Sequence, residues 1–508
     1  MNILMTLEMA ASAGERPAVT LDDRSLSAAR ILALARRATE RFRGAPAVLY
    51  RAPNHLAYPV ALFGCALAGV PFVPLNYRLG ADQLAEIEGR HPGAVRIGPD
   101  DLEGLLDATG EPSGGDVPAP WDQDAVAVIL YTSGTTAAPK AALLRHRHLL
   151  AYVLNTLEFN SAAEGDAALV AVPPYHIAGL TNLMSNLYTG RRVVYLRAFS
   201  ADEWLAAVRR EKVTHAMLVP TMLARIVDEL PAGEDAGVPT LRSLAYGGAR
   251  APRTVVEKAL RAFPDTDFVN AYGLTETSSS IAVLGPGDHR AALTGDDPVV
   301  RDRLTSVGRP LPGVEIELRT VDGESCPPGS TGLVHVRGEQ ISGEYRGRSV
   351  LDADGWFPTG DLGRLDADGY LYVEGRADDT IIRGGENIAP AEIEDVLLEH
   401  PAVREAVVIG VPDEEWGQRI VAVLVSGEEG VEPEEIRLWA RDRLRTSKTP
   451  DTVVLRAELP RTGTGKLLRR TLIAELAEPA ASAASATSAS PASSASSAEL
   501  DNPEKSHA

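Results

Sequence analysis

Between residues 126 and 270, short apolar runs alternate with amphipathic segments of helical length. The apolar runs predict strands at 168–172, 192–196, 214–219, 241–246 and 266–270. The segments between them predict helices at about 177–188, 200–210, 221–230 and 252–263. Such alternation is typical of parallel sheets with helices on both faces, and it indicates the α/β class. Residues 45–75 repeat the pattern, with a helix expected over about 57–69 and a strand over about 70–75.

The pattern changes after residue 305, where turn-forming Pro, Gly and Asp residues separate short strands such as 332–337. This texture predicts an antiparallel sheet or a small barrel that completes the large domain. Residues 376–477 predict a compact α+β unit, with helices at about 390–399 and 432–446 and strands at about 403–410 and 419–425. Residues 478–508 are mostly alanine and serine, and we expect a disordered tail because such a composition cannot bury a core.

Net charge narrows the range of partners. The 508 residues carry a formal charge of −20, which disfavours nucleic acid or an anionic membrane surface as a partner. An anionic ligand can still bind in a locally positive pocket. The stretch Leu56–Tyr77 has no charge, but its prolines and glycines would break one long helix, so no membrane span is expected.

Features of the chain ends and the cysteines favour a reduced, cytoplasmic location. The N-terminus carries Glu8 and lacks the basic region of a signal peptide. The two cysteines, Cys65 and Cys326, lie far apart in the sequence, so a disulfide framework is not expected.

A hydroxyl-rich segment, Tyr131–Thr136 followed by Pro139-Lys140, comes directly after the predicted strand 126–130. Hydroxyls and backbone N–H groups around a glycine can bind a polyphosphate. The spacing differs from the P-loop pattern G-x-x-x-x-G-K-[ST], so that mechanism is not assumed. A solvated polar loop is the alternative.

Two further motifs lie at predicted strand ends, where ligands gather in α/β sheets. In Asn270–Glu276, Glu276 is a suitable magnesium ligand and Tyr272 offers a flat face to a purine. The alternative for Glu276 is a carboxylate favoured by a helix start. Tyr246–Arg250 contains two glycines, which allow a planar ring to lie against the backbone, although they also suit a simple turn.

Two motifs towards the C-terminus carry charge. Asp361, in Gly355–Asp361, can accept both hydroxyls of a ribose, and Arg376 can donate to the sugar or to phosphate. A surface turn with a solvated ion pair is the alternative. Lys466, in Pro460–Lys466, can swing over a phosphoryl group on its glycine-rich loop, or it can be an ordinary lysine in a turn.

Together and in this order, these motifs resemble the adenylate-forming superfamily, which includes acyl-CoA synthetases, firefly luciferase and the adenylation domains of peptide synthetases. The resemblance covers about residues 15–477, and it includes Asn54, Ala68–Leu75, Val307–Gly313 and Arg383–Glu394. It implies a large N-terminal domain (1–375) of parallel sheets and helices with a small β-barrel-like part. It also implies a hinge at 376–378 and a smaller, mobile α+β domain at 379–477.

The resemblance also implies roles for matching residues. The phosphate loop would comprise Thr132, Ser133, Gly134, Thr135, Thr136 and Lys140. The adenine would be enclosed by Gly247, Gly248, Ala249 and Tyr272. The other cofactor-binding residues in these two motifs would be Arg250, Asn270, Ala271, Gly273, Leu274 and Thr275. Magnesium would be served by Thr136 and Glu276, ribose by Asp361 and Arg376, and the adenylation step by Lys466 with Glu276 and Arg376. Asp378 would be the hinge about which the small domain turns to present Gly384 and Gly385 for thioester formation.

The phosphate loop departs from the family pattern T-S-G-T-T-G-x-P-K-G at two positions, Ala137 and Ala141. If the replaced glycine has a positive φ in relatives, Ala137 would be strained or the loop would follow another path. We expect activity, with loop dynamics and ATP affinity as the properties affected.

The implied reaction joins a carboxylic acid to AMP from MgATP and then transfers the acyl group to a thiol. The leading interpretation is a ligase using coenzyme A. One alternative passes the acyl group to a carrier-protein thiol or partner enzyme, and another is a non-catalytic binder of nucleotide and acid. Pro173–Gly179 resembles the segment that lines the acyl pocket in acyl-CoA synthetases. His176 stands where amino-acid-activating relatives carry an aspartate, so an acid without an α-amino group is expected. His176 can gate the pocket or be a satisfied core histidine. Ala178 and Gly179, with Gly248, leave room for a long or bulky apolar monocarboxylic acid.

Overall fold

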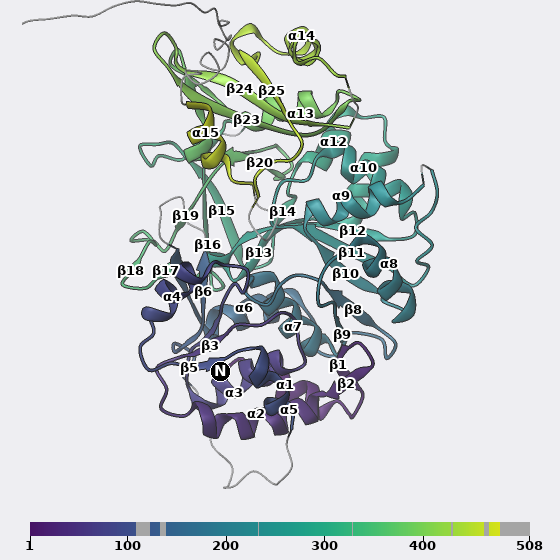
Figure 1. The fold of residues 1–508 in the computed structure, drawn as a ribbon, viewed down its shortest axis with the longest axis vertical. Helices are drawn as coiled ribbons and strands as arrows, with labels where there is room; N and C mark the ends of the chain where they lie inside the picture. The colour runs from purple at the N-terminus through teal and green to yellow at the C-terminus, as the bar shows by residue number, and fades with distance from the viewer. Residues whose placement is uncertain are drawn as a thin grey trace, which may run out of the picture.

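The computed structural model describes residues 1–107, 122–132, 139–231, 233–327, 329–427, 430–461 and 467–477. Ser133, Gly134, Thr135, Thr136, Lys466 and the Ala/Ser-rich stretch 478–508 lie outside the described residues. Figure 1 shows the N-terminal helices α1 (Leu4–Ser12), α2 (Ala28–Phe42) and α3 (Ala57–Ala68) at one end of the molecule and the C-terminal elements at the other.

A nine-stranded sheet forms the centre of the larger part, in the order β14-β13-β12-β11-β10-β8-β9-β1-β2. Its strands are β1 (Pro17–Leu21), β2 (Arg24–Ser27), β8 (Ala167–Val170), β9 (Arg192–Tyr195), β10 (His215–Leu218), β11 (Ser243–Gly247), β12 (Asp267–Leu274), β13 (Ser279–Leu284) and β14 (Arg309–Pro310). The helices between its strands include α7 (Ile177–Thr189), α8 (Ala201–Arg210), α9 (Pro220–Glu229) and α10 (Arg253–Ala262). The five strands and four helices predicted here are confirmed, although β12 continues four residues further, to Leu274.

The interior strands of this sheet pair in parallel, from β12 through β11, β10, β8 and β9 to β1. The outer strands β2, β13 and β14 pair antiparallel. Because the interior strands are parallel, their carboxyl ends meet at one edge of the sheet, where the predicted nucleotide motifs follow.

A seven-stranded sheet has the order β18-β17-β7-β6-β4-β3-β5. Its strands are β3 (Val48–Tyr50), β4 (Phe72–Pro74), β5 (Val95–Ile97), β6 (Val126–Thr132), β7 (Lys140–Arg145), β17 (Glu344–Tyr345) and β18 (Arg348–Ser349). The helices nearby in sequence are α4 (Ala81–Gly89), α5 (Leu102–Leu106) and α6 (His146–Thr156). Strand β17 joins β7 through the pairing of Tyr345 with Ala142, which brings two distant segments together.

The uncharged stretch 56–77 is explained by burial. Nearly all of α3 and β4 is enclosed, with Phe63, Cys65 and Phe72 fully buried. No helix in the described part of the chain is long and apolar enough to cross a bilayer. Cys65 is buried and Cys326 partly exposed, and both are free thiols.

Asn54 shows how a buried polar side chain connects strand ends. Its Nδ2 donates to the carbonyls of Val172 and Leu196, at 3.2 and 3.1 Å, and more distantly to that of Val170 at 3.4 Å. A buried amide without partners would be costly. These bonds fix the carboxyl ends of β8 and β9. The end of β8 leads into residues 173–179, the segment expected to line the acyl pocket and called here the acyl segment.

The turn-rich region after residue 305 forms a four-stranded antiparallel sheet, β15-β16-β19-β20, as expected from its short strands. Its strands are β15 (Val314–Arg319), β16 (Gly332–Gly338), β19 (Phe357–Leu365) and β20 (Leu371–Arg376), and the helices α11 (Pro286–Thr294) and α12 (Pro298–Asp302) precede it. Among the described residues, β15 and β20 are the two outer strands.

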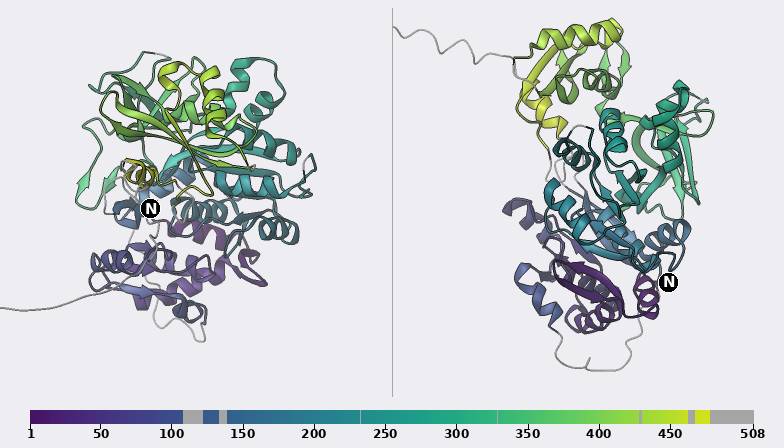
Figure 2. Two further views of the ribbon diagram at one scale, coloured as in Figure 1. Left: turned by 45° about the horizontal axis from the view of Figure 1, so that its top comes forward. Right: turned by 90° about the vertical axis from the view of Figure 1, so that its right-hand side faces the viewer.

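Residues after 380 build a smaller α+β part with its own apolar clusters. It contains β21 (Ile381–Arg383), β22 (Glu386–Ile388), α13 (Pro390–Leu398), β23 (Val403–Asp413), β24 (Gly417–Ser426), α14 (Pro433–Arg443), β25 (Thr452–Arg456) and α15 (Arg469–Ala477). The predicted helices and strands are confirmed, and Figure 2 shows this part at one end of the molecule. The domain boundaries at 375–379 stay a prediction.

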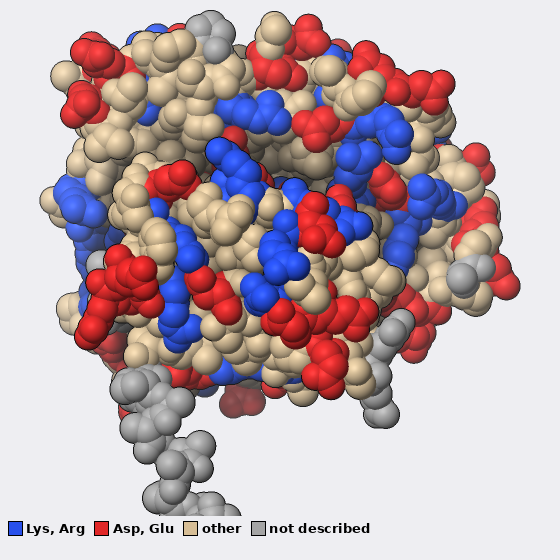
Figure 3. All heavy atoms as spheres, turned by 90° about the horizontal axis from the view of Figure 1, so that it is seen from above, with Lys and Arg blue, Asp and Glu red and all other residues tan. Residues whose placement is uncertain are grey.

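Surface charge is unevenly distributed despite the net charge of −20. On the face seen in Figure 3, Lys and Arg side chains gather around a hollow. Locally positive regions are therefore available to an anion.

Candidate active site

The strand before the hydroxyl-rich motif continues into a hairpin. Strands β6 and β7 are antiparallel, with Thr132 opposite Lys140, and the Thr132 hydroxyl lies 3.5 Å from the Lys140 carbonyl oxygen. Ser133, Gly134, Thr135 and Thr136 fall outside the described residues, as does Ala137. Ala141 lies within β7 opposite Tyr131 and is not among the residues with positive φ. Its replacement of glycine therefore strains nothing.

The two glycine-containing motifs lie side by side at the carboxyl ends of β11 and β12. Gly247 pairs with Ala271, and Tyr246 with Asn270. A Cβ atom on Gly247 would lie 2.1 Å from the Ala271 carbonyl oxygen, so this close approach requires glycine. The structure thus brings Gly247–Arg250 next to Asn270–Thr275, and their role in holding adenine stays a prediction.

Tyr272, Asp361 and Arg376 form a hydrogen-bonded group, called here the Asp361 cluster. Asp361 and Arg376 are opposite one another on β19 and β20, with Arg376 Nη1 at 2.8 Å from Asp361 Oδ1. Tyr272 donates its hydroxyl to Asp361 Oδ2 at 2.5 Å. The Asp361 side chain is only 8 % exposed, so this is no solvated surface pair.

The charges of this cluster reinforce one another. Burial, and then the neighbouring Asp361 carboxylate, raise the pKa of the Tyr272 hydroxyl well above its usual value. For Arg376, burial by itself lowers the pKa, but Asp361 and Glu276 more than offset it, so the pKa is raised. At neutral pH, Tyr272 therefore donates its proton and Arg376 is charged.

Glu276 lies in a short turn (Thr275–Thr277) after β12 and is buried. Its Oε1 accepts a hydrogen bond from the Tyr345 hydroxyl at 2.5 Å, and burial followed by Glu276 raises the pKa of Tyr345. The described residues donate no hydrogen bond to Oε2. A single carboxylate with a free oxygen suits Mg²⁺, which binds through one or two carboxylates together with substrate phosphates.

Ser278 and Ser279, which follow the turn of Glu276, have positive φ angles that are unusual for residues other than glycine. The angle is 54° for Ser278 and 133° for Ser279. Such conformations cost on the order of 1–3 kcal/mol each and cluster at functional sites. The buried Gln340 holds this turn, since its Nε2 donates to the carbonyls of Thr277 and Ser280 at 3.0 and 2.8 Å. The sequence motifs did not identify Tyr345, Gln340, Ser278 or Ser279 as residues near the site.

The acyl segment presents buried polar atoms without partners. Tyr175 is buried, and both its hydroxyl and Nε2 of His176 lack a hydrogen bond among the described residues. Burial, with a smaller contribution from Arg78, lowers the pKa of His176 to about 4. The imidazole is therefore neutral at pH 7. These two residues are called here the His176 wall, and whether His176 gates the pocket or is a core histidine stays open.

Gly179 lies against the backbone of its own segment. A Cβ atom there would lie 2.8 Å from the Pro173 carbonyl oxygen, so the backbone of Pro173 already occupies that space. Further along α7, Thr181 contacts Ser279, with 3.2 Å between the hydroxyl oxygens. Among the described residues, Asn182 Nδ2 donates only to the Met217 sulfur, at 3.8 Å. The membership of Ala178, Gly179 and Gly248 in a substrate pocket stays a prediction.

The predicted hinge and thioester elements lie beyond β20. Asp378 is in a short turn (Ala377–Asp379), and Gly384 and Gly385 form the turn of the β21–β22 hairpin. Arg250, expected near the nucleotide, forms an ion pair with Asp395 of α13. Lys466 is outside the described residues, although Arg461 and Leu467 on either side of its loop form a β-bridge.

Comparisons with known proteins identify this arrangement. The family model for AMP-binding enzymes matches residues 88–346, and the model for the AMP-binding enzyme C-terminal domain matches residues 392–466. A feruloyl-CoA synthase of Amycolatopsis is 36 % identical over 445 residues, covering 83 % of this chain and 87 % of the relative. A fatty acid–[acyl-carrier-protein] ligase of Streptomyces coeruleorubidus is 34 % identical over 454 residues, covering 84 % and 86 %.

Solved structures agree. The o-succinylbenzoate CoA synthetase from Bacillus subtilis, in complex with its acyl-adenylate intermediate, has a TM-score of 0.78 at 31 % identity over 92 % of this chain and 97 % of the other. The same synthetase has also been solved with ATP and a magnesium ion. The fold and site therefore define an AMP-forming acid–thiol ligase of the adenylate-forming type. The chain belongs to the AMP-binding enzyme family, which confirms the resemblance.

Proposed function

We propose that this enzyme activates a carboxylic acid with ATP to an acyl-AMP and then transfers the acyl group to coenzyme A. The observation that carries the proposal is the placement of the Asp361 cluster and Glu276 around the carboxyl ends of β11 and β12. Asp361 Oδ1 and Oδ2 are held by Arg376 and Tyr272, so the carboxylate is oriented to accept ribose hydroxyls. Glu276 lies in the turn after β12, and this turn contacts β7, which begins at Lys140.

Residues of the chain act in the reaction by binding and positioning. The substrate carboxylate oxygen attacks the α-phosphorus, the bond to the bridging oxygen breaks, and pyrophosphate leaves with the electron pair. Arg376 and Lys466 supply positive charge, and Lys140 contacts the phosphates. Glu276 and Thr136 would hold Mg²⁺, which would neutralise phosphate charge when bound. A thiol then attacks the acyl carbon and expels AMP, so no protein nucleophile is required.

The acceptor is the first point that needs an experiment. Relatives named as CoA synthases favour coenzyme A, whereas the relative named as a carrier-protein ligase supports the alternative of a protein thiol. AMP release measured with acid and ATP, with and without free coenzyme A, separates the two. Strong stimulation by coenzyme A supports the proposal, and release that depends on a carrier protein with a free thiol supports the alternative.

The acid is proposed to be a bulky, largely apolar monocarboxylate without an α-amino group. Residues 173–190 contain no carboxylate that could pair with an ammonium group, and His176 is neutral because of its lowered pKa. Two relatives are named for aromatic acids, feruloyl and 2-succinylbenzoate, which supports a bulky acyl group. A pyrophosphate-exchange screen across fatty, aromatic and polycyclic acids tests this assignment, and preference for amino acids would contradict it.

Substitution of Lys466 tests the two-step chemistry. Lys466→Ala should reduce acid-dependent pyrophosphate exchange by at least about 100-fold, because an oriented cation at the transition state is lost. Thiolysis of a supplied acyl-AMP should change less than about threefold, since that step does not use the lysine. Lys258→Ala, an exposed lysine on α10, is the control. Equal loss of both half-reactions would contradict the assigned role.

A further inference from the structure

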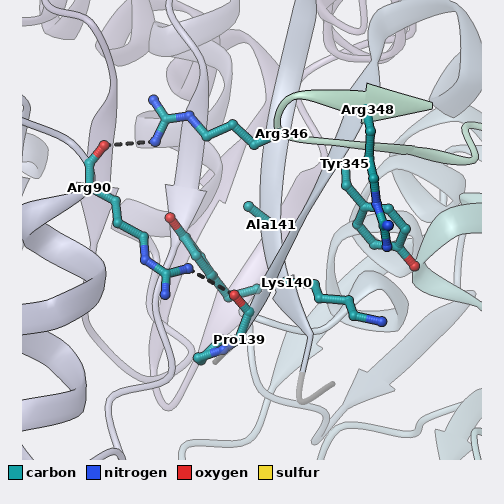
Figure 4. A pocket seen from close by; sticks show the side chains of 8 residues that line it. Arg90, Pro139, Lys140, Ala141, Tyr345, Arg346 and Arg348 are labelled. Carbon is teal, nitrogen blue, oxygen red and sulfur yellow. Dashed lines mark hydrogen bonds between the residues drawn. The ribbon is translucent and has the colours of Figure 1, made fainter. Parts of the chain in front are cut away.

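A cavity of about 270 Å³ lies beside the β6–β7 hairpin, and it is called here the arginine cavity. Figure 4 shows its lining, which comes from three separated segments of the chain. Its walls are Arg90, Tyr131, Pro139, Lys140, Ala141, Tyr345, Arg346 and Arg348. Four of these eight residues are cationic and none is acidic, in a chain of net charge −20.

Most of this positive charge has no carboxylate partner. Arg90 forms an ion pair with Glu86 at 2.6 Å. In contrast, Lys140, Arg346 and Arg348 make no salt bridge with any Asp or Glu of the described ranges. Of the nearby carboxylates, Glu344 pairs with Arg145 at 2.6 Å, and Glu276 accepts a hydrogen bond from Tyr345 and forms no ion pair with these cations among the described residues. Three neighbouring cations without counter-charges repel one another, so an anion between them is stabilised.

Hydrogen bonds to backbone carbonyl oxygens hold the walls of the cavity in place. Arg90 Nη1 donates to the Pro139 carbonyl oxygen at 2.8 Å, and Arg346 Nη1 donates to the Arg90 carbonyl oxygen at 2.7 Å. The backbone N–H of Arg346 donates to the Ala141 carbonyl oxygen at 3.1 Å. A guanidinium has five N–H donors, so these bonds leave most of them for a ligand. Arg346 and Arg348 are exposed, which gives an anion access from solvent.

The size of the cavity favours a compact anion. Pockets for drug-sized ligands span roughly 300–1,000 Å³, whereas this one measures about 270 Å³. The nucleotide half of coenzyme A would not be enclosed, but a diphosphate with its several oxygens would reach two or three cations at once. Charge-assisted bonds from Arg to phosphate are among the stronger hydrogen bonds in proteins.

We propose that the arginine cavity binds inorganic pyrophosphate as it leaves the adenylation site, with Arg346 and Arg348 as its outer ligands. The inference rests on the proposed function, which makes pyrophosphate the first product. Lys140 lines the cavity and also belongs to the predicted phosphate loop, so the two sites share one cationic residue. Retention of pyrophosphate there favours the reverse reaction and product inhibition, whereas forward adenylation does not require it.

The test compares two double variants of equal charge change. In Arg346→Gln/Arg348→Gln, the inhibition constant for pyrophosphate in the forward reaction and the KM for pyrophosphate in exchange should both rise at least about tenfold, because one strong charged contact is worth about that factor and the variant removes two. The KM for ATP should change less than about twofold. Arg261→Gln/Arg301→Gln, on α10 and α12 far from the cavity in sequence, is the control and should change neither constant.

Binding of two phosphate-containing ligands, pyrophosphate and 3′,5′-ADP, is measured at constant ionic strength to show which one the cavity recognises. Pyrophosphate should bind more weakly to the variant, whereas 3′,5′-ADP, the nucleotide end of coenzyme A, should be unaffected. Weakened 3′,5′-ADP binding with unchanged pyrophosphate constants would overturn the proposal, as would unchanged constants for both. Equilibrium dialysis of labelled pyrophosphate with the resting enzyme measures the cavity directly. If the wild type shows no acid-dependent exchange but the variant still loses this binding, the proposed function fails while the anion site stands.

Discussion

The Asp361 cluster and the His176 wall both contain buried polar atoms, but these atoms have hydrogen-bond partners in the cluster and lack them in the described part of the wall. In the cluster, both carboxylate oxygens of Asp361 have partners on Tyr272 and Arg376. In the wall, the Tyr175 hydroxyl and His176 Nε2 have none among the described residues. A buried polar atom without a partner costs about 1–3 kcal/mol, so the protein tolerates a cost in one region that it avoids in the other.

The difference is explained if the two regions meet different ligand chemistry. A ribose presents the same two hydroxyls in every cycle, so a rigid, prepaired carboxylate suits it. An acyl group of apolar character presents few polar atoms, and a neutral imidazole beside an aromatic ring suits that surface. Such pockets are mostly apolar with a few polar groups. The comparison therefore predicts that changes in the cluster affect ATP, whereas changes in the wall affect the acid and the pH dependence of stability.

The largest effect is expected from Asp361→Asn, which keeps the size of the side chain but removes its charge. Arg376 would lose its carboxylate, and one amide group would replace two acceptors. We expect kcat/KM for ATP to fall about 100-fold and the KM for the acid to change less than about threefold. Asp366→Asn, at the turn between β19 and β20, is the matched control. Equal losses for ATP and acid would remove the functional distinction between the two regions.

The sequence predicted the first region better than the second, and it did so where contacts follow from local pattern. Asp361 and Arg376 are 15 residues apart on adjacent strands of one antiparallel pair, so turn signals between them already suggest a contact. Tyr272 comes from another sheet, and its bond to Asp361 spans 89 residues. A local sequence pattern cannot predict a contact between residues so far apart in the chain, because the contact forms only when the two sheets pack together.

The same reason explains the residues that the motifs missed. Tyr345 reaches Glu276 because β17 pairs with β7, and the Arg346–Arg90 contact joins residues 256 apart. Gln340 reads as an ordinary polar residue in sequence, although it is buried under the strained turn at Ser278 and Ser279. At Gly179, a Cβ atom would lie 2.8 Å from the Pro173 carbonyl oxygen, a close approach that the sequence did not predict. Close backbone approaches of this kind depend on tertiary geometry.

The next prediction concerns the pH dependence of stability. His176 has a pKa lowered to about 4, against an ordinary value of 6.5, so the unfolded state binds its proton more tightly. Stability is therefore lost as pH falls below about 6.5, and the loss grows until the pH reaches about 4. At pH 5 this loss amounts to about 2 kcal/mol relative to pH 7.5. His176→Leu should be less sensitive to this change of pH by that amount in denaturant unfolding.

A second histidine separates the wall from burial in general. His148 on α6 also has a pKa lowered to about 4, mainly by burial. His148→Leu should reduce the pH sensitivity similarly but leave the KM for the acid unchanged, whereas His176→Leu should alter that KM. If His176→Leu leaves the pH sensitivity at the wild-type value, the imidazole is not held neutral by burial.

The smallest effect compares one hydroxyl in each region. Tyr272→Phe removes the donor to Asp361 and leaves a buried carboxylate oxygen unpaired, so it should lower the free energy of unfolding by about 1–2 kcal/mol. Tyr175→Phe removes a buried hydroxyl that has no partner among the described residues, so it should change the free energy by less than about 0.5 kcal/mol or raise it slightly. Urea unfolding followed by tryptophan fluorescence measures both variants under one condition. Because both substitutions delete a tyrosine hydroxyl, the difference between their effects on the free energy of unfolding measures the contribution of the hydrogen-bond partner. Equal losses would mean that Tyr175 has a partner of its own, such as a buried water, and the contrast between the paired cluster and the unpaired wall would then disappear.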